Sequence, residues 1–307
     1  MSSSLKRPEP TPPHALPDVT AAAPAGAPLA IICGGGAFPL AVAEAARRAG
    51  REVVLFPVRG FADASVEAWP HVWIHIGRFG RLKSEMRRLG CRDVVFIGNV
   101  LRPRIRDIRF DWTTLTLLPQ VFRMLRGGDD HLLTSLGRLF EEAGFRLVGA
   151  HEIAPEILIP VGQLGSLAPA AEQMEDIALG RQVLAVTGPL DIGQGLVVMN
   201  RHVVAVEAAE GTDLMLARVA ELRANGRIKM PPRCGVLVKR PKAGQDRRLD
   251  LPSLGVRTVE GAARAGLAGI AVEAGGVIVA DVEALVRAAD RAGIFIYAFE
   301  RDGAGEA

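Results

Sequence analysis

The sequence predicts an α/β protein of two domains, the first built on a doubly wound, mostly parallel sheet and the second on a mixed α/β arrangement. Short apolar runs alternate with helical segments over residues 29–149, which is typical of consecutive βαβ units. Residues 156–169 are rich in Pro, Gly, Leu and Ser and lose this periodicity, as a linker does. The 307 residues also suit two domains of ordinary size. We therefore expect domains over 29–157 and 158–301.

In the first domain, each predicted strand is a short run of mainly apolar residues. The first run, residues 29–33, leads through three glycines into a helix over 38–49 that Gly50 ends. Further strands are expected at 52–56, 72–76, 93–97 and 146–149, and further helices at 79–89, 112–125 and 129–143.

The second domain mixes a hairpin with strands and helices. The turn of the hairpin is expected at Asn200 and Arg201, between apolar runs that together span 195–206. Other strands are expected at 236–239, 270–272, 277–279 and 294–299, and helices at 171–186, from 212 onward, at 256–265 and at 281–291.

Composition narrows the class of protein. Hydrophobic residues make up 49% of the chain and the net charge is +3, but no Lys/Arg block is interleaved with aromatic residues, so we expect no nucleic-acid partner. Three widely spaced cysteines favour reduced thiols and a cytoplasmic location. Residues 1–28 lack the apolar core of a secretory signal and are expected to form a disordered tail. The apolar runs elsewhere are too short to cross a bilayer.

Residues 239–255 form a dense polar stretch near the C-terminal end of the chain. Its cations are Lys239, Arg240, Lys242, Arg247 and Arg248, and its acids are Asp246 and Asp250. Cations hold phosphate, and carboxylates hold a divalent metal or take a proton from water, so the stretch suits phosphoryl chemistry. A solvated, self-neutralising loop is the alternative interpretation of the same residues.

Gly34, Gly35 and Gly36 stand between the first strand and its helix. Glycines at such a turn let backbone N–H groups approach a phosphate. The dinucleotide-binding pattern also requires an acid near the end of the second strand, which is absent there, so NAD is disfavoured. NADP, with Arg59 on its 2′-phosphate, and a plain structural turn stay as alternatives beside a nucleotide or phosphosugar contact.

Other polar residues of the first domain follow predicted strands or precede a helix. Asn99 and Arg102 come after the fourth strand, where open α/β sheets bind ligands, and suit a base or ribose and a phosphate respectively. Asp130 adjoins Asp129, which is a natural helix cap, and His151 follows the last strand of the domain. For each of these residues an ordinary structural role is the competing interpretation.

In the second domain, polar residues flank the hairpin. Gln194 precedes it, and Glu207, Glu210, Thr212 and Asp213 follow it. Capping the next helix requires one of these side chains, whereas three neighbouring acids repel one another unless a metal or a cation lies close. The charged stretch could supply such cations.

The order of the motifs carries a family resemblance. The motifs are Gly34-Gly-Gly-x-x-Pro39, Gly98-Asn-Val100 with Arg102-Pro103, Gly128-Asp-Asp130, Gly149-Ala-His-Glu152, Asp191-Ile-Gly-Gln194, Glu207-x-x-Glu-Gly-Thr-Asp213, Arg248-x-Asp-Leu-Pro252 and Ala265-Gly-Leu-Ala-Gly-Ile270. As an ordered set covering about residues 29–300, they resemble the UDP-2,3-diacylglucosamine pyrophosphatases of the LpxI type.

The resemblance implies a fold, an activity and roles for residues. The fold is a Rossmann-like nucleotide-binding domain followed by a catalytic, lipid-binding domain, with the site between them. The activity is Mg²⁺-dependent hydrolysis of UDP-2,3-diacylglucosamine to UMP and 2,3-diacylglucosamine 1-phosphate in lipid A biosynthesis. The essential aspartate of the family falls on Asp250, and Asp246 is of second rank.

From this resemblance and the residue types we assign roles to the candidates. Asp250 would ligate Mg²⁺ or orient water, with Asp213 and Glu210 as further metal ligands. Substrate and phosphate contacts are expected from Gly34, Gly35, Gly36, Asn99, Arg102, Asp130, His151, Gln194, Thr212, Lys239 and Arg247.

Two other functions stay open at this point, an NADP-linked oxidoreductase and a non-catalytic nucleotide-sugar binding protein. A lipid substrate also implies transient contact with the inner face of the inner membrane. A homodimer is a further open expectation.

Overall fold

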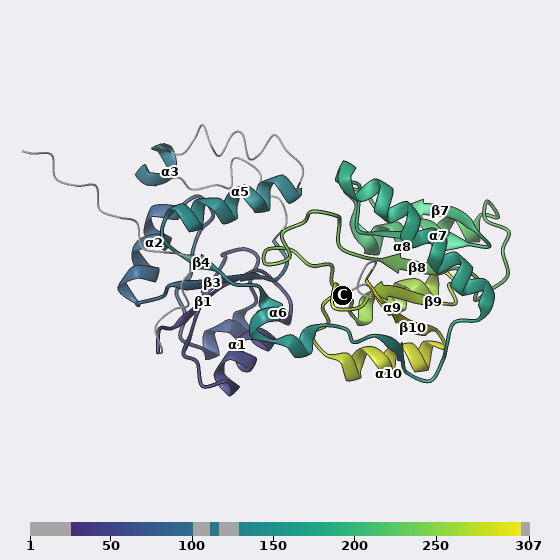
Figure 1. The fold of residues 1–307 in the computed structure, drawn as a ribbon, viewed down its shortest axis with the longest axis horizontal. Coiled ribbons are helices and arrows are strands. Elements are labelled where there is room, and N and C mark those ends of the chain that lie inside the picture. The colour runs from purple at the N-terminus through teal and green to yellow at the C-terminus, as the bar shows by residue number, and fades with distance from the viewer. Residues whose placement is uncertain (1–25, 101–110, 117–128, 302–307) are drawn as a thin grey trace, which may run out of the picture.

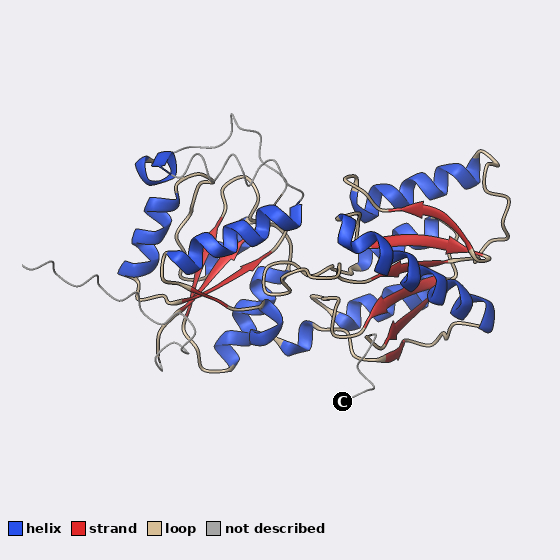
Figure 2. Ribbon diagram, turned by 45° about the horizontal axis from the view of Figure 1, so that its top comes forward, coloured by secondary structure: helices blue, strands red, loops and turns tan. Residues whose placement is uncertain are grey.

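The computed structural model describes residues 26–100, 111–116 and 129–301. Over these residues the chain forms two α/β parts that lie side by side (Figure 1). The strands of the two parts make separate sheets, each accompanied by helices (Figure 2). The fold class predicted from the sequence is therefore confirmed, with a parallel sheet in the first part and a mixed sheet in the second.

The first sheet is parallel and has the strand order β2-β1-β3-β4. Its strands are β1 (Leu29–Cys33), β2 (Val53–Pro57), β3 (Asp93–Ile97) and β4 (Arg146–Leu147). The helices of this part are α1 (Phe38–Arg48), α2 (Phe79–Arg88), α3 (Trp112–Thr116), α5 (Asp129–Glu142) and α6 (Ala150–Ile153), with 3-10 turns η1 (Ala64–Ala68) and η3 (Pro155–Ile157). Strand β1 is fully buried, as its unbroken apolar run requires.

The segment predicted as a strand over 72–76 runs beside β2 without forming a regular strand. The backbone N–H groups of Val72 and Ile74 donate to Leu55 O and Pro57 O, both at 2.9 Å. The pairing of this segment with β2 is limited to isolated bridges at Leu55 and Val58, because Pro57 between them has no N–H to donate to the segment. Of the helix predicted over 112–125, α3 is the part that falls within the described residues.

An ion-pair cluster holds the amino-terminal edge of this sheet. The side chain of Asp93, at the start of β3, is 1% exposed and accepts hydrogen bonds from Arg146 at 2.7 and 2.8 Å and from Arg51 at 2.6 Å. Burial alone would raise the pKa of Asp93, but the hydrogen bonds from the two arginines outweigh it and lower the pKa below its ordinary value. The cluster thus ties β3 and β4 to the segment that leads into β2.

The second sheet is mixed and has the order β5-β10-β9-β8-β6-β7. Its strands are β5 (Gly162–Leu164), β6 (Gly195–Met199), β7 (His202–Val206), β8 (Val236–Lys239), β9 (Gly269–Glu273) and β10 (Phe295–Phe299). The central strands β8, β9 and β10 are parallel, and β5, β6 and β7 pair antiparallel to their neighbours. The run predicted as a strand at 277–279 forms isolated bridges through Ile278 instead.

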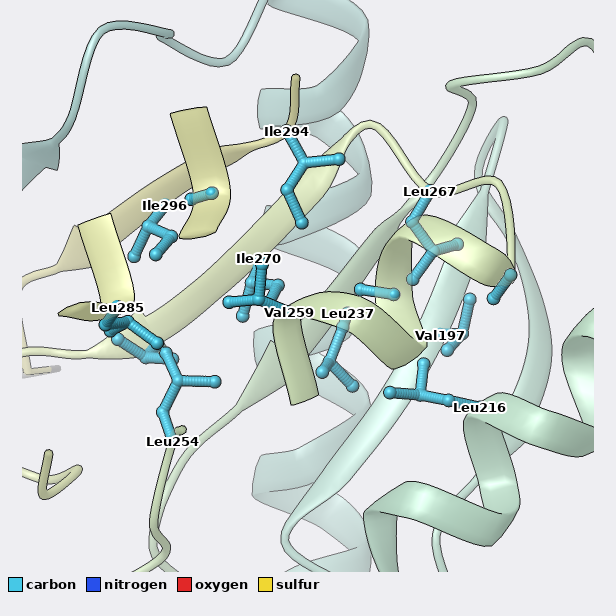
Figure 3. Close-up of a cluster of buried hydrophobic side chains, with 14 of the residues drawn as sticks. Val197, Leu216, Leu237, Leu254, Val259, Leu267, Ile270, Leu285, Ile294 and Ile296 are labelled. Carbon is cyan, nitrogen blue, oxygen red and sulfur yellow. The ribbon is translucent and has the colours of Figure 1, made fainter. Parts of the chain in front are cut away.

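Helices α7 (Ala171–Thr187), α8 (Gly211–Ala224), α9 (Val256–Arg264) and α10 (Val282–Ala292) accompany this sheet. Its largest core lies between sheet side chains such as Val197, Leu237 and Ile270 and helix side chains such as Leu216 and Val259 (Figure 3). These side chains are all fully buried. The strong amphipathic pattern of α9 and α10 in the sequence explains why these helices pack on the sheet.

The predicted hairpin turn is confirmed. Asn200 and Arg201 both have positive φ angles, 48° and 60°, as a tight two-residue turn requires. The carboxylate of the buried Asp176 on α7 accepts a hydrogen bond from the backbone N–H of Arg201 at 2.6 Å. Helix α7 therefore fixes the far end of β6 and β7.

Candidate active site

Polar side chains gather at one end of the strands of the second sheet. Strands β8 and β9 end there, β6 begins there and β7 ends there, as the pairing of Lys239 with both Gly195 and Val272 shows. We call this group the charged edge; it consists of Gln194, Glu207, Lys239 and Glu273. The charged stretch predicted from the sequence begins at this edge, where the backbone N–H of Arg240 donates to Gln194 O at 3.0 Å.

Asp250 is held at the charged edge by two amides. Its Oδ2 accepts a hydrogen bond from Gln194 Nε2 at 3.0 Å and a second from Gln245 Nε2. Gln245 is itself buried, and its Oε1 accepts from the backbone N–H of Lys242 at 3.0 Å. The structure thus brings together two predicted site residues, Asp250 and Gln194.

Lys239 lies buried near this carboxylate rather than on the surface. It is 5% exposed, and its ammonium donates to Thr212 Oγ1 at 2.7 Å and to Ser253 O at 3.3 Å. Thr212 in turn donates to Glu207 Oε1 at 3.1 Å. These two contacts hold the Lys239 ammonium inside the protein, away from the surface.

The charge of Lys239 is balanced by the acids around it. Burial lowers the pKa of Lys239, and the negative charges of Glu207, Asp213 and Asp250 act in the opposite direction. Glu207 Oε2 is a buried atom without a hydrogen-bond partner among the described residues. The positive charge of the Lys239 ammonium offsets the negative charge of this carboxylate. The charged stretch was predicted to bring a cation close to these acids, and in the structure that cation is Lys239.

The remaining acids of the predicted metal site are paired with arginines. Glu210, directly before α8, contacts Arg218 of that helix at 2.7 Å, and Asp213 contacts Arg257 on α9 at 2.8 Å. Over residues 26–100, 111–116 and 129–301 no three acidic, histidine or cysteine side chains come close enough to hold a metal ion. The structure therefore does not assemble Asp250, Asp213 and Glu210 into a ready three-carboxylate site.

The buried acid Glu273 fixes two arginines of the charged stretch. Glu273, at the end of β9, is fully buried and pairs with Arg247 at 2.6 Å and with Arg240 at 3.1 Å. The predicted phosphate contact Arg247 is thus oriented by Glu273. Its side chain is 28% exposed, so it is not closed off from solvent.

The segment that carries Asp250 is anchored in the first part of the chain. Leu249 is 9% exposed and packs in a core cluster that includes Phe140 and Leu147. On its other side Leu251 packs against the cluster around β1. Both chain neighbours of Asp250 therefore pack on the first part, Leu249 buried and Leu251 partly buried, while its carboxylate bonds to the second.

Asp246 stabilises the turn before Asp250. Its carboxylate accepts from the backbone N–H of Arg248 at 3.0 Å and pairs with that guanidinium at 2.7 Å. The hydrogen bond from the Arg248 side chain, opposed by burial, lowers the pKa of Asp246. Arg248 also reaches Glu141 on α5 at 3.0 Å. These contacts give Asp246 a structural role in the described residues.

The three glycines of the first part bond to the protein's own atoms. The N–H groups of Gly34 and Gly35 donate to Ile97 O and Asn99 O, both at 2.9 Å, and that of Gly36 donates to Asp63 Oδ2 at 2.9 Å. A Cβ on Gly34 would lie 2.6 Å from Asn99 O, so glycine there permits the close approach of two chain segments. The phosphate contact predicted for these glycines stays a prediction.

Four other residues of the first part were predicted to contact the substrate, and the structure describes the side chains of two of them. The exposed Asn99 bridges to Gly35 through its backbone. His151 lies in α6, and its Nδ1 is buried without a hydrogen-bond partner among the described residues. Arg102 lies outside the described residues, and Asp130 is in the first turn of α5 with its side chain outside the description.

Sequence reasoning missed two residues of the site, Gln245 and Glu273. Glu273 carries a readable signal, because a charged residue that ends a buried apolar strand needs a partner. Gln245 has no such signal, since its contact with Asp250 depends on how the loop folds back.

Comparisons with known proteins agree with this architecture. Residues 28–157 match the model of the LpxI N-terminal domain, and residues 160–297 match that of the LpxI C-terminal domain. The chain is 46% identical over 268 residues to a UDP-2,3-diacylglucosamine pyrophosphatase LpxI of Caulobacter vibrioides, a match that covers 87% of this chain and 96% of the relative. The chain belongs to the LpxI family.

Proposed function

We propose that this protein hydrolyses the pyrophosphate of UDP-2,3-diacylglucosamine to UMP and 2,3-diacylglucosamine 1-phosphate, a step of lipid A biosynthesis. Membership of the LpxI family and the name of the Caulobacter relative support the substrate. The observation that carries the chemistry is the carboxylate of Asp250, held by two amides near a buried ammonium. An acid held in this way can orient a water molecule for attack on phosphorus.

The charges of the substrate explain the neighbours of Asp250. A pyrophosphate diester carries negative charge on both phosphates, and charge must be neutralised as the leaving phosphate departs. Arg247 is placed by Glu273 and partly exposed, so it is the cation of the charged stretch best suited to a phosphate oxygen. Lys239 acts from inside the protein: its ammonium donates to Thr212, and its positive charge offsets the negative charge of the surrounding acids.

Mg²⁺ is part of this proposal in a limited form. Mg²⁺ commonly binds one or two carboxylates together with substrate phosphates and keeps several waters. The donor set fits that use, because the carboxylates near Lys239 include Asp250 and Asp213 while no three-ligand cluster occurs among the described residues. Asp250, with Asp213 as the second candidate, would hold the ion against the substrate, where it would neutralise phosphate charge.

The uridine half is assigned to the first part of the chain. The exposed side chain of Asn99 follows β3 at the carboxyl end of the parallel sheet, where such sheets bind nucleotides. The N–H groups of Gly34, Gly35 and Gly36 would have to exchange their present partners to bind a phosphate.

The diacyl half would contact apolar surface near Gln194. Val186, Leu190 and Ile192 are 71%, 67% and 39% exposed and lie just before Gln194 in the chain. Leu214, in the first turn of α8 beside Thr212, is 62% exposed. None of the helices in the described part of the chain has the length and apolar character needed to cross a membrane. From these exposed apolar side chains we propose that the protein takes up the acyl chains through transient contact with the membrane surface.

The direct test is to incubate the purified protein and Mg²⁺ with UDP-2,3-diacylglucosamine and to follow UMP. Release of UMP together with the acylated sugar phosphate is expected. Tight binding of the UDP-sugar without any UMP would instead indicate a binding protein. Oxidation or reduction of a nicotinamide cofactor in place of hydrolysis would indicate the oxidoreductase.

A further inference from the structure

We propose that Gln194 and Gln245 are positioning residues that form an amide clamp on Asp250 and act on the reaction only through that carboxylate. The inference rests on the proposed hydrolysis and adds a distinct role to it. Gln194, which the sequence suggests as a substrate contact, instead donates to Asp250 in the structure, and Gln245 joins it on the same oxygen.

The direction of these hydrogen bonds is fixed by the partners. The Lys242 backbone N–H can only donate, so the oxygen of the Gln245 amide faces Lys242 and its nitrogen faces Asp250. The nitrogen of Gln194 likewise faces the Asp250 oxygen, at 3.0 Å. An amide nitrogen cannot accept, so both contacts require Asp250 Oδ2 to act as the acceptor.

The two glutamines come from different parts of the second domain. Gln194 directly precedes β6, and its carbonyl accepts from the backbone of Arg240, which fixes it to the sheet. Gln245 belongs to the same loop as Asp250 and is 8% exposed. The clamp therefore connects the loop to the sheet at the side chain whose chemistry the reaction needs.

Burial makes this arrangement costly unless both ends of the amide are bonded. A buried amide that fails to find partners loses hydrogen bonds to water, so Gln245 is stable at this position through both of its contacts. One contact, to Lys242, supports the backbone of the loop. The other contact, to Asp250, sets the orientation of the carboxylate, and a displacement of about 1 Å at a reacting group can cost about 10²-fold in rate.

The experiment compares Gln245→Met and Gln194→Met with Gln163→Met, a matched control at an exposed glutamine of β5. Methionine keeps the side-chain length and removes the donor. We expect kcat for UMP release to fall about 10- to 100-fold in each clamp variant, with KM within about two-fold of the wild type, because the loss is in orientation and not in substrate binding. The control should match the wild type.

Gln245→Glu separates the clamp from a purely structural role. Ionised glutamate keeps an oxygen for the Lys242 N–H, presents no donor to Asp250 and places a like charge beside it. We expect kcat to fall at least as far as in Gln245→Met. Wild-type kcat in the glutamate variant would show that Asp250 needs no donor from position 245, and that result overturns the inference.

Other outcomes also decide the question. A rise in KM at unchanged kcat would mean that the glutamines contact the substrate, and wild-type kcat in both methionine variants would mean that the clamp is idle. If Gln245→Met fails to fold, as judged by its thermal unfolding, Gln194→Met and Gln245→Glu decide alone. Absence of UMP release by the wild type would refute the proposed hydrolysis, whereas active wild type with unaffected variants refutes only the clamp.

Discussion

The two sheets differ in what meets at the ends of their strands. After β1 and β3, backbone meets backbone, since Gly35 and Asn99 exchange two hydrogen bonds of 2.9 Å. At the charged edge of the second sheet, side chains meet side chains, and Asp250 and Lys239 lie within a network of acids and amides. In this protein the glycines at the strand ends permit close packing of two chain segments, whereas the converging polar side chains of the second sheet form the candidate site.

The largest effect that tests this comparison is expected at Asp250. Asp250→Asn keeps the shape of the side chain but removes its charge, so we expect UMP release to fall about 10²- to 10⁴-fold, the range for loss of a group that transfers or orients a proton. The measurement is kcat with saturating substrate and Mg²⁺. Glu283→Gln, at a side chain 87% exposed on α10, is the control. Full activity in Asp250→Asn would move the reaction away from the charged edge.

Lys239→Met tests whether the charged edge depends on its buried ammonium. Removing one member of a buried ionic network leaves the others uncompensated, here Glu207, and typically costs about 3–5 kcal/mol of unfolding free energy. Denaturant unfolding measures the loss, with the exposed Lys229→Met as control. A loss below about 1 kcal/mol, the size expected of a surface pair, would contradict the proposed network.

Asp93→Asn makes the corresponding test at the opposite, amino-terminal edge of the first sheet. We expect a loss of about 3–5 kcal/mol, because Arg51 and Arg146 lose their shared partner. Since the folded pKa of Asp93 is lowered, its contribution is present above its unfolded value and is lost as pH falls below 3.8 toward the folded pKa.

The pH dependence of the unfolding free energy tests the role of Asp93 separately. Chemical unfolding between about pH 7 and about pH 2 should show a steeper acid loss of stability in the wild type than in Asp93→Asn. The variant Glu52→Gln, at an exposed neighbouring acid, should keep the wild-type slope. Equal slopes in wild type and Asp93→Asn would show that the pKa of Asp93 is not lowered by folding.

The smallest effect is expected at the glycines. Asp63→Ala removes the acceptor for the Gly36 N–H at an exposed site, and we expect a loss of about 1 kcal/mol with KM within about two-fold of the wild type. The measurements are denaturant unfolding and KM for the UDP-sugar. A clearly lower KM would break the comparison, because it would mean that Asp63 competes with a substrate phosphate for this N–H group.

The elements of the fold were largely predictable from the sequence because their signals are local. Apolar runs located β1, β3, β6 and β8, and Gly50 correctly marked the end of α1. The runs at 72–76 and 277–279 misled, since an apolar run indicates burial but does not show whether the neighbouring chain offers an unbroken ladder of backbone hydrogen bonds.

The sequence selected candidate residues that the structure brings together, but it did not predict their contacts. Asp250, Gln194, Thr212 and Lys239 were selected from motifs, and the structure brings them together. Which atoms meet depends on strand register and on the path of the loop, which the motifs do not encode. For that reason the sequence could not show that Lys239 is buried or that Gln245 reaches Asp250.

The insertion of Leu249 and Leu251 into the first part of the chain bears on how the protein can be divided. Each half could be expressed as a separate fragment, as the two family models delimit them. The second fragment would then expose Leu249 to water and release Arg248 from Glu141. Asp250 would lie on an untethered loop, so fragments supplied together would have to rebind through these side chains before any activity returned. A chimera that takes one half from a relative would likewise need a first half that accommodates Leu249 and Arg248.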